Sequence, residues 1–540
     1  MLGRLPVLAA LSALVSARDA VVDLGYARYR GETLSNGVAQ WLGIRYAAPP
    51  VGPLRFAAPQ DPEDEHDIQD AIQHGPVCIR ASRYPIPEGS SEDCLFLDVY
   101  APTQSRRDSS KLLPVYVFIQ GGGFSSNGNP YYNGSGLIQA SDMNIIVVNF
   151  NYRVGPYGFL AGSEILEGGS VNNGLKDQIQ VLKWVQKHIR EFGGDPDHVV
   201  VGGDSAGGAS VTLLLSAYGG RDDGLFHAAA AESQSFATML TVDESQFAYD
   251  NLVNRTGCSD AGDTLDCLRN LDIEDLQREN IVTPFPGAQR RPLYMYGPTI
   301  DGDLVPDYTY NLFQQGRFIH VPVIFGDVTN EGTKFVPEDL ASDSATYVWL
   351  QAQWPSLTPA HFSRIHEYYL QDVNSTRPFP NATRYWRPVS DAYGEIRYVC
   401  PGIALNAAYA EAGVPSWNYH YAVQDPEDEA SGLGVYHVVE LVAIWGPDSV
   451  WFSDTISQPP PESYFTSNAP IIPVMQGYWT SFIRSFDPNT YRHRGSPRWE
   501  AWGEPERLFV RTGETKMERV PEGQTERCEY FTSIGVELRQ

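Results

Sequence analysis

The chain has 540 residues, of which 42% are hydrophobic and 19% are charged, and this balance predicts a globular protein with a large buried core. Its formal net charge of −27 argues against nucleic acid as a partner, because phosphate binding depends on clusters of Lys and Arg. Length alone would suggest several domains, but large α/β enzymes often keep one central sheet with long insertions, so we expect a single domain over residues 18–540.

The first 17 residues have the pattern of a signal peptide. Arg4 precedes an apolar run at residues 5–11, and small residues close the segment before residue 18. No later stretch approaches the roughly 20 apolar residues of a membrane span, and residues 535–540 carry neither a hydrophobic anchor tail nor a retention signal. We therefore expect a secreted, extracellular protein without an integral membrane anchor.

Strand and helix signals alternate in the first half of the chain. Apolar, β-branched runs occupy residues 115–119, 145–150 and 199–201, and a helical period covers residues 175–192. This alternation predicts an α/β fold with a mostly parallel sheet and helices that cover it.

The second half of the chain is less regular. Further strands are expected at residues 321–325 and 417–421. Between residues 235 and 322, and again from 343 to 398, the pattern is helical and irregular, which predicts insertions that pack over the functional edge of the sheet. No internal repeat, low-complexity tract or flexible linker divides the chain.

A glycine-rich turn occupies residues 120–124, directly after the strand expected to end at Ile119. Attack on an ester carbonyl develops an oxyanion, and preorganised backbone N–H groups stabilise it. The turn is placed to supply such donors, although taken alone it would also fit a plain connecting loop.

The sequence Gly-Asp-Ser-Ala-Gly at residues 203–207 places Ser205 in a Gly-x-Ser-x-Gly pattern. The pattern is weak by itself, but here it follows a buried strand and leads into a helix-compatible run, which is the context of a nucleophile elbow. The glycines permit a strained turn that projects the hydroxyl toward a base, and this context displaces the interpretation as a helix-capping serine. Ala206 would give a further oxyanion donor through its N–H.

In this fold the triad follows the chain order nucleophile, acid, histidine. The histidines that lie late enough to serve are His361, His366, His420, His437 and His493. Two fall in a helical insertion, His420 lies in a strand pattern, and His493 sits between arginines in an expected exposed turn, so these are interpreted as packing or surface residues. His437 lies in a glycine-containing loop after a strand, where a general base can approach a nucleophile.

Spacing does not choose the acid of the triad. Asp327 and Glu331 both follow the strand that ends at Phe325, and either could orient the histidine. With either acid, hydrolysis through an acyl-enzyme requires no metal and no cofactor. Phe124 and Phe236 are candidates for an apolar acyl pocket, with plain core packing as the equal alternative.

Six cysteines follow the signal segment, an even number that suits three disulfides in an oxidising compartment. The shortest loops to close pair Cys78 with Cys94 and Cys258 with Cys267, which leaves Cys400 and Cys528 by elimination; no pair has a short metal-ligand spacing. In a protein secreted by a eukaryote, four sequons would also be candidate N-glycosylation sites, at Asn133, Asn254, Asn374 and Asn381.

Five further motifs lie along the chain. They are residues 41–56, which end in Pro-Pro-Val-Gly-Pro-Leu-Arg-Phe, Glu-Asp-Cys-Leu at 92–95, Asn-Tyr-Arg-Val-Gly at 151–155, Phe-Gly-Gly-Asp-Pro at 192–196 and Asn-Glu-Gly-Thr at 330–333. Together with the elbow they resemble the type-B carboxylesterase, lipase and cholinesterase family, and the resemblance covers roughly residues 25–450. It implies the α/β-hydrolase fold and a serine esterase.

The same resemblance implies roles for individual residues. Glu331 becomes the acid, His437 the base, and Gly122, Gly123 and Ala206 the oxyanion donors. The disulfide pattern of the family also matches the two short-loop pairings.

The chain departs from the family next to the nucleophile. Asp204 stands where the family often has Glu, and is one methylene shorter. Glu440 matches a second buried carboxylate of the family, and we expect both to help orient His437 from behind.

A second departure lies in the loop between Cys78 and Cys94. The loop is shorter than the mobile lid of the family's lipases, and Tyr84 is its only aromatic residue. It therefore lacks the Trp that stacks on quaternary ammonium groups in cholinesterases. Both features favour cleavage of soluble esters over cholinesterase-like or interfacial action.

These observations predict a secreted carboxylic ester hydrolase that takes a small-molecule ester; no feature predicts an oligomeric state. The alternatives are an interfacial lipase that acts on long-chain acylglycerols, and a catalytically silent adhesion or binding homologue. The intact set of Ser205, Glu331 and His437 argues against the silent homologue.

Overall fold

The fold is taken from a computed structural model, which describes residues 20–103, 111–376, 378–450 and 459–540. The predicted signal peptide at residues 1–17 lies outside these ranges.

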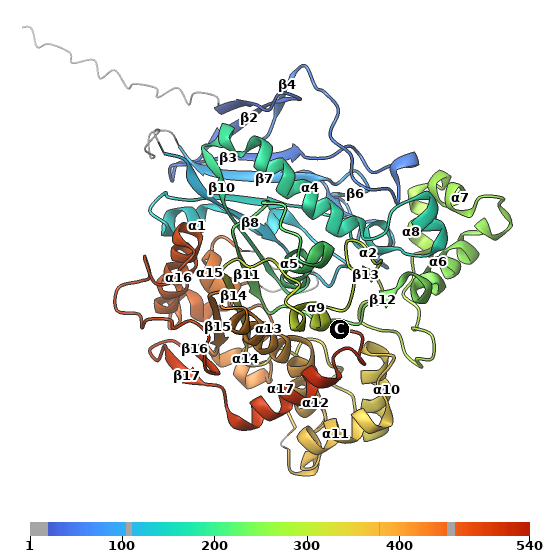
Figure 1. Cartoon of the computed structure of the whole chain (residues 1–540), viewed down its shortest axis with the longest axis vertical. Helices are drawn as coiled ribbons and strands as arrows, with labels where there is room; N and C mark the ends of the chain where they lie inside the picture. Colours follow the sequence, from blue (N-terminus) through green and yellow to red (C-terminus); the bar gives the residue numbers. More distant parts are fainter. Residues whose placement is uncertain (1–19, 104–110, 377, 451–458) are drawn as a thin grey trace, which may run out of the picture.

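A 13-stranded sheet forms the centre of the fold (Figure 1). Its middle strands, from β9 (Ile146–Phe150) to β16 (Glu506–Val510), pair in parallel, and the strands toward both ends pair antiparallel, except that β4 (Ile68–Asp70) pairs in parallel with β2 (Arg28–Thr33). In spatial order the strands are β1 (Ala20–Asp23), β2 (Arg28–Thr33), β3 (Val38–Arg45), β7 (Phe96–Pro102), β9 (Ile146–Phe150), β8 (Leu113–Ile119), β10 (Gly194–Asp204), β11 (Ala228–Glu232), β14 (Val323–Val328), β15 (Ser416–Tyr421), β16 (Glu506–Val510) and β17 (Lys516–Arg519), with β4 (Ile68–Asp70) beside β2. The mostly parallel sheet expected from the sequence is confirmed.

Helices cover both faces of the sheet, which explains why its central strands are apolar on both sides. The helices that flank the sheet are α1 (Ser135–Ala140), α2 (Gly155–Phe159), α3 (Ser163–Gly168), α4 (Asn173–His188), α5 (Ala206–Ser216), α13 (Cys400–Glu411), α14 (Pro426–Ser431), α15 (Leu441–Trp445), α16 (Ile472–Ser485) and α17 (Glu522–Ile534). Alternate residues of β8 point to opposite faces, so that Val115 and Val117 join the core under α4 and α5, whereas Tyr116 and Phe118 join the core under α1, α15 and α16.

The two irregular stretches of the sequence form helical insertions, as expected. The first holds α6 (Val242–Thr256), α7 (Thr264–Asn270), α8 (Ile273–Glu279) and α9 (Thr309–Gln314), and the second holds α10 (Asp343–Gln353), α11 (Pro359–Tyr369) and α12 (Trp386–Gly394). In Figure 1, α6–α8 lie to the right of the sheet and α10–α12 at its lower right. A π-helical turn, Glu395–Val399, joins α12 directly to α13. Two short strand pairs, β12 (Leu240–Thr241) with β13 (Thr299–Ile300) and β5 (Val77–Cys78) with β6 (Ser90–Ser91), lie outside the large sheet.

Three disulfides join the predicted cysteines. They link Cys78 to Cys94, Cys258 to Cys267 and Cys400 to Cys528, so all three pairings are confirmed. The last one ties α13 to α17. Among the sequons, Asn254, Asn374 and Asn381 are exposed and Asn133 is half-buried. In the part of the chain that the structure describes, no helix has both the length and the apolar character needed to span a membrane.

Candidate active site

Ser205 occupies the sharp turn between the end of β10 and the start of α5. Its backbone angles are φ 54° and ψ −117°, a conformation that non-glycine residues rarely adopt. The turn fits only because its neighbours are glycines. A Cβ on Gly207 would lie 1.8 Å from the carbonyl oxygen of Ile119, and a Cβ on Gly203 would lie 2.6 Å from the same atom. Ser205 therefore stands at the carboxyl edge of the sheet in the elbow geometry predicted for it.

The glycine turn after β8 lies against this elbow. Gly122 and Gly123 have φ values of 115° and 62°, and a Cβ on Gly123 would lie 2.1 Å from the ring of Tyr294. Ala206 is the first residue of α5, so its N–H has no partner within the helix. The turn and the helix start thus bring the three predicted oxyanion donors to the same end of the sheet.

Asp204 connects the elbow to the glycine turn. Its Oδ1 accepts a hydrogen bond from Gly121 N at 2.9 Å, and a Cβ on Gly121 would lie 2.7 Å from its Oδ2. Burial raises the pKa of Asp204 to about 6, against the opposing effects of the Gly121 N–H and of His437. Its hydrogen bond thus reaches the backbone of the oxyanion turn.

His437 and Glu331 meet beside the elbow. The Nδ1–H of His437 donates a short hydrogen bond to Glu331 Oε2, while Glu331 Oε1 accepts from Ser233 Oγ at 2.8 Å and from Val328 N at 2.9 Å. In the described residues, His437 Nε2 has no hydrogen-bond partner. This nitrogen can accept a proton from a serine hydroxyl, in a contact that often tightens only when substrate binds.

Burial controls the protonation of this pair. Glu331 is 1% exposed, and burial raises its pKa, while hydrogen bonds from Val328 N and Ser233 Oγ oppose the shift and favour the carboxylate. Burial also lowers the pKa of His437 to about 3; Asp204 opposes this shift, and Arg397 and Lys334 add to it. The imidazole is therefore held neutral, which is the state that a general base requires.

The alternative acid, Asp327, lines a polar cavity together with Glu331, His420 and Arg507. Burial raises its pKa to about 8 although Arg507 counteracts the shift. Of the two carboxylates that spacing left open, Glu331 is the one bonded to His437.

The other histidines have partners of their own or lie at the surface. His361 pairs with Glu537 and His366 with Asp343, both in the second insertion, while His420 is bonded to Glu518 and Thr329 from within β15. His493 is exposed.

Two more buried carboxylates lie behind the pair. Glu440 Oε1 accepts from Ser233 Oγ at 3.2 Å and from Tyr419 Oη at 3.0 Å, and Glu232 Oε1 accepts from Trp479 Nε1 at 2.9 Å. Burial raises the pKa of both well above the usual range, and the neighbouring carboxylates raise it further. Ser233 thus links Glu440 to Glu331, and Glu331 in turn is bonded to His437.

Asn330 explains part of the motif at residues 330–333. Its N–H donates to Val435 O and its Oδ1 accepts from Val435 N, both at 2.9 Å, and Thr333 Oγ1 donates to Leu433 O at 2.9 Å. These contacts hold the loop that carries Glu331 against the loop that carries His437.

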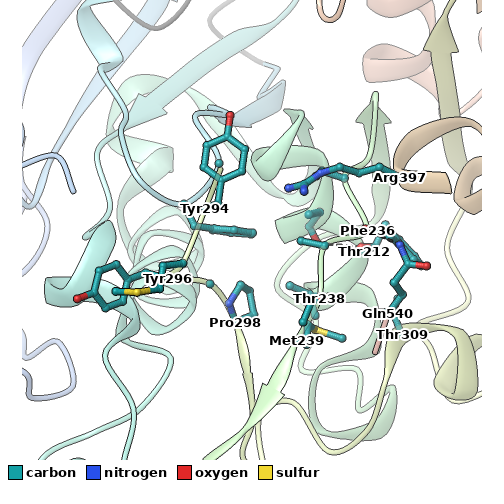
Figure 2. A pocket seen from close by; sticks show the side chains of 18 residues that line it. Thr212, Phe236, Thr238, Met239, Tyr294, Tyr296, Pro298, Thr309, Arg397 and Gln540 are labelled. Carbon is teal, nitrogen blue, oxygen red and sulfur yellow. Dashed lines mark hydrogen bonds between the residues drawn. The ribbon is translucent and has the colours of Figure 1, made fainter. Parts of the chain in front are cut away.

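A cavity opens next to the oxyanion turn (Figure 2). Its walls include Phe124 and Phe236, the two residues predicted for an acyl pocket, together with Tyr294 and Arg397. The two phenylalanines also belong to the main core, where Phe124 packs on Phe159 and Phe236 packs on Tyr310. The sequence left open whether these two side chains line a pocket or pack in the core, and in the structure they do both.

The loop between Cys78 and Cys94 is fastened to α8. Gln277 Nε2 donates to the carbonyl oxygens of Arg80 and Arg83 at 2.7 and 3.0 Å, and Arg278 lies over the ring of Tyr84. Tyr84 itself is 47% exposed. The contacts bind the loop to the body of the protein.

Some residues of the site escaped sequence reasoning, namely Ser233, Tyr294 and Arg397. None belongs to a motif, and two of them lie in the insertions, where periodicity gives no position relative to the elbow. Ser233 carries one signal in retrospect, because it follows β11 directly at the edge where β10 ends at the elbow.

Comparison with known proteins relates the whole chain to esterases and lipases. The model of the carboxylesterase family matches residues 18–531. The crystal structure of Aspergillus niger EstA superposes with a TM-score of 0.91 at 43% identity and covers 97% of this chain and 99% of that chain. Secreted lipase 4 of Gibberella zeae is 31% identical over 92% of this chain and 90% of its own length. Para-nitrobenzyl esterase of Bacillus subtilis is 30% identical over 95% and 99%, respectively.

Proposed function

The chain belongs to the carboxylesterase family and is a carboxylic ester hydrolase with the α/β-hydrolase fold, and we propose that it works through an acyl-enzyme on Ser205 with His437 as base and Glu331 as acid. The observation that carries this proposal is the hydrogen bond from His437 Nδ1 to Glu331, made beside an elbow serine in a rare backbone conformation. A histidine with one nitrogen bonded to a carboxylate presents the other nitrogen as the base.

In the first half-reaction Ser205 Oγ attacks the ester carbonyl carbon while His437 Nε2 takes the hydroxyl proton. The carbonyl oxygen becomes an oxyanion and accepts hydrogen bonds from the N–H groups of Gly122, Gly123 and Ala206. The bond to the alcohol oxygen then breaks, and His437 returns the proton to the leaving alcohol. The acyl group remains on Ser205.

The second half-reaction repeats these steps with water. His437 takes a proton from the water as its oxygen attacks the acyl carbon, and the proton passes to Ser205 Oγ as the carboxylic acid leaves. Every proton is moved by His437, whose orientation depends on Glu331.

The preferred substrates are small soluble esters. The cavity next to the oxyanion turn is small, with a volume of about 40 Å³, and the Cys78–Cys94 loop is bound to α8. The second candidate function, an interfacial lipase, is favoured by the name of the Gibberella zeae relative. An acyl series from acetate to palmitate, with and without an emulsified interface, separates the two, because a sharp rate increase at the interface would contradict the preference for soluble esters.

Secretion is part of the proposal. It is supported by the signal-like residues 1–17, by the three disulfides, and by the relative named a secreted lipase. Occupied sequons at the exposed Asn254, Asn374 and Asn381 would accompany it. Peptide mapping of the protein from the culture medium of a eukaryotic host tests both statements.

The role of Ser205 is tested by Ser205→Ala. We expect kcat on an aryl ester to fall by roughly five to six orders of magnitude with an unchanged melting temperature, and an organophosphate that labels the wild type to leave no adduct. Ser533→Ala, an exposed serine of α17, is the matched control and should keep both turnover and labelling. An unlabelled, inactive but folded wild type would instead favour the silent homologue.

A further inference from the structure

Arg397 is a buried cation inside the cavity next to the oxyanion turn. It is 5% exposed, lies in the π-helical turn Glu395–Val399, and lines the same cavity as Gly123 and Phe124. Within the described ranges it forms no salt bridge with a carboxylate. Single π-helical turns inside longer helices occur frequently at functional sites.

The position of Arg397 is fixed close to the nucleophile. Its Nε–H donates to Ser235 Oγ at 2.8 Å, and the N–H of Ser235 donates to the carbonyl oxygen of Ser205 at 3.3 Å. The N–H of Phe236 donates to the carbonyl oxygen of Arg397 at 2.8 Å. One residue, Ser235, thus connects the guanidinium to the elbow.

The surroundings of the guanidinium are aromatic and uncharged. Its central carbon lies 5.4, 5.6 and 5.8 Å from the ring centroids of Tyr294, Tyr393 and Tyr398. Burial raises the pKa of Tyr393 to about 12 and that of Tyr398 well above its usual range, so the phenols stay neutral. Figure 2 shows the side chain directed into the cavity toward Tyr294.

This environment leaves the charge of Arg397 without an opposite charge. Aromatic rings stabilise a guanidinium only partly, and a buried charge is costly unless it is paired and hydrogen-bonded. After Nε is engaged, the two terminal nitrogens still carry four N–H donors in a planar fork. Carboxylates and phosphates are the groups that such a fork binds through two parallel hydrogen bonds, and of the two a carboxylate can end an acyl chain.

The cavity receives the acyl part of an ester rather than the alcohol. His437 must protonate the leaving alcohol, so the alcohol has to lie beside the imidazole. The lining of the cavity includes Gly123 of the oxyanion turn and Ser235, whose N–H donates to the carbonyl oxygen of Ser205, and it includes neither Ser205 itself nor His437. An acyl chain bound to Ser205 would therefore extend into the cavity toward Arg397.

Resting on the proposed function, we infer that Arg397 is a specificity-determining residue that selects esters whose acyl chain ends in a carboxylate, as in half-esters of short dicarboxylic acids. The restricted volume of the cavity limits such chains to a few carbon atoms. The net charge of −27 gives an anionic ester no long-range attraction, so the preference depends on the local cation.

The test compares two esters that share an alcohol and differ at one end. Monoethyl succinate carries the carboxylate, and ethyl 4-methylpentanoate replaces it by an uncharged branched group of similar size. We expect wild-type kcat/KM to favour monoethyl succinate by about tenfold or more, and Arg397→Met to lower this ratio by at least about 100-fold, mainly through the KM of the half-ester. Arg397→Lys should recover part of the ratio, and Arg364→Met, at a surface arginine paired with Glu367, should leave it unchanged.

Each other outcome has a definite meaning. A wild type that prefers the uncharged ester, or a ratio that Arg397→Met leaves unchanged while Ser205-dependent hydrolysis persists, overturns the role of Arg397 and leaves the proposed function intact. Failure of the wild type on both esters and on an aryl ester overturns the proposed function itself. If Arg397→Met does not fold, as judged by circular dichroism, the wild-type ratio together with Arg397→Lys still decides.

Discussion

The two halves of the active site are built by different means. On the nucleophile side, Ser205 and the turn at residues 120–124 are shaped by backbone geometry and by glycines. The space at these glycines is so tight that an added Cβ would lie as little as 1.8 Å from a neighbouring atom. On the base side, His437 is bonded to the buried carboxylate of Glu331, and Ser233 joins Glu331 to a second buried carboxylate, Glu440. Substitutions on the nucleophile side should therefore lower activity through steric collision, and substitutions on the base side through a change of charge.

After Ser205→Ala, Glu331→Gln should produce the largest effect, and it tests the charge side. Glutamine keeps the shape of the side chain and an acceptor for Val328 N, but it can no longer stabilise an imidazolium or hold His437 in the correct tautomer. We expect kcat/KM on a soluble ester to fall by about 10⁴-fold, measured by initial rates.

Asp327→Asn is the matched control for that variant. Asp327 is also buried and has a raised pKa of about 8, but it lies in the cavity with Arg507 rather than against His437. Its replacement by asparagine should lower kcat/KM less than about tenfold. If Asp327→Asn were the more damaging of the two, the assignment of the acid would be wrong.

Gly123→Ala tests the backbone side and should have the next largest effect. The added methyl group would lie 2.1 Å from the ring of Tyr294 at a residue with φ 62°, so the turn has to move and its N–H with it. Loss of one oxyanion donor lowers kcat by about 10²- to 10³-fold, and we expect a loss in this range with little change in KM.

Gly297→Ala provides the steric comparison in the same cavity. Its added Cβ would lie 3.9 Å from the nearest atom, on Phe124, which is an ordinary contact. We expect near wild-type kcat for this variant. Equal losses for both glycines would mean that filling the cavity, and not displacement of a donor, explains the effect.

The nucleophile side is also the part that could be predicted from sequence. Glycines at 121–123, 203 and 207 and the strand–turn–helix pattern are local signals, and the backbone around Ser205 adopts the geometry they predict. The parallel sheet could be predicted for the same reason, because its strands appear in the sequence as apolar runs. The family resemblance added the choice of Glu331 over Asp327, which spacing alone left open.

The base side and the cavity depend on contacts between distant segments. Ser233 and Glu331 are 98 residues apart, and Arg397 is 162 residues from the Ser235 that it contacts. Arg397 also reaches the cavity through a π-helical turn, which shifts the helical period that a sequence pattern assumes. Long-range burial and pairing decide the charges here, and no local pattern records them.

Glu440→Gln is the mildest change and tests the electrostatics of the base side through stability. The pKa of Glu440 is raised by burial in the folded protein from an ordinary 4.5, so the folded state binds its proton more tightly than the unfolded chain does. A carboxyl group whose pKa is raised in the folded state contributes its full stabilisation at low pH. This contribution is lost as the pH rises from about 4.5, the pKa in the unfolded chain, through the pKa in the folded state. Glutamine does not titrate, so the melting temperature of the variant minus that of the wild type should increase from pH 5 to pH 8, by roughly 2–5 °C.

The control is Glu522→Gln, at an exposed residue of α17, for which this difference in melting temperature should not change with pH. If the difference for Glu440→Gln did not change with pH either, the carboxyl of Glu440 would already be ionised in the folded protein.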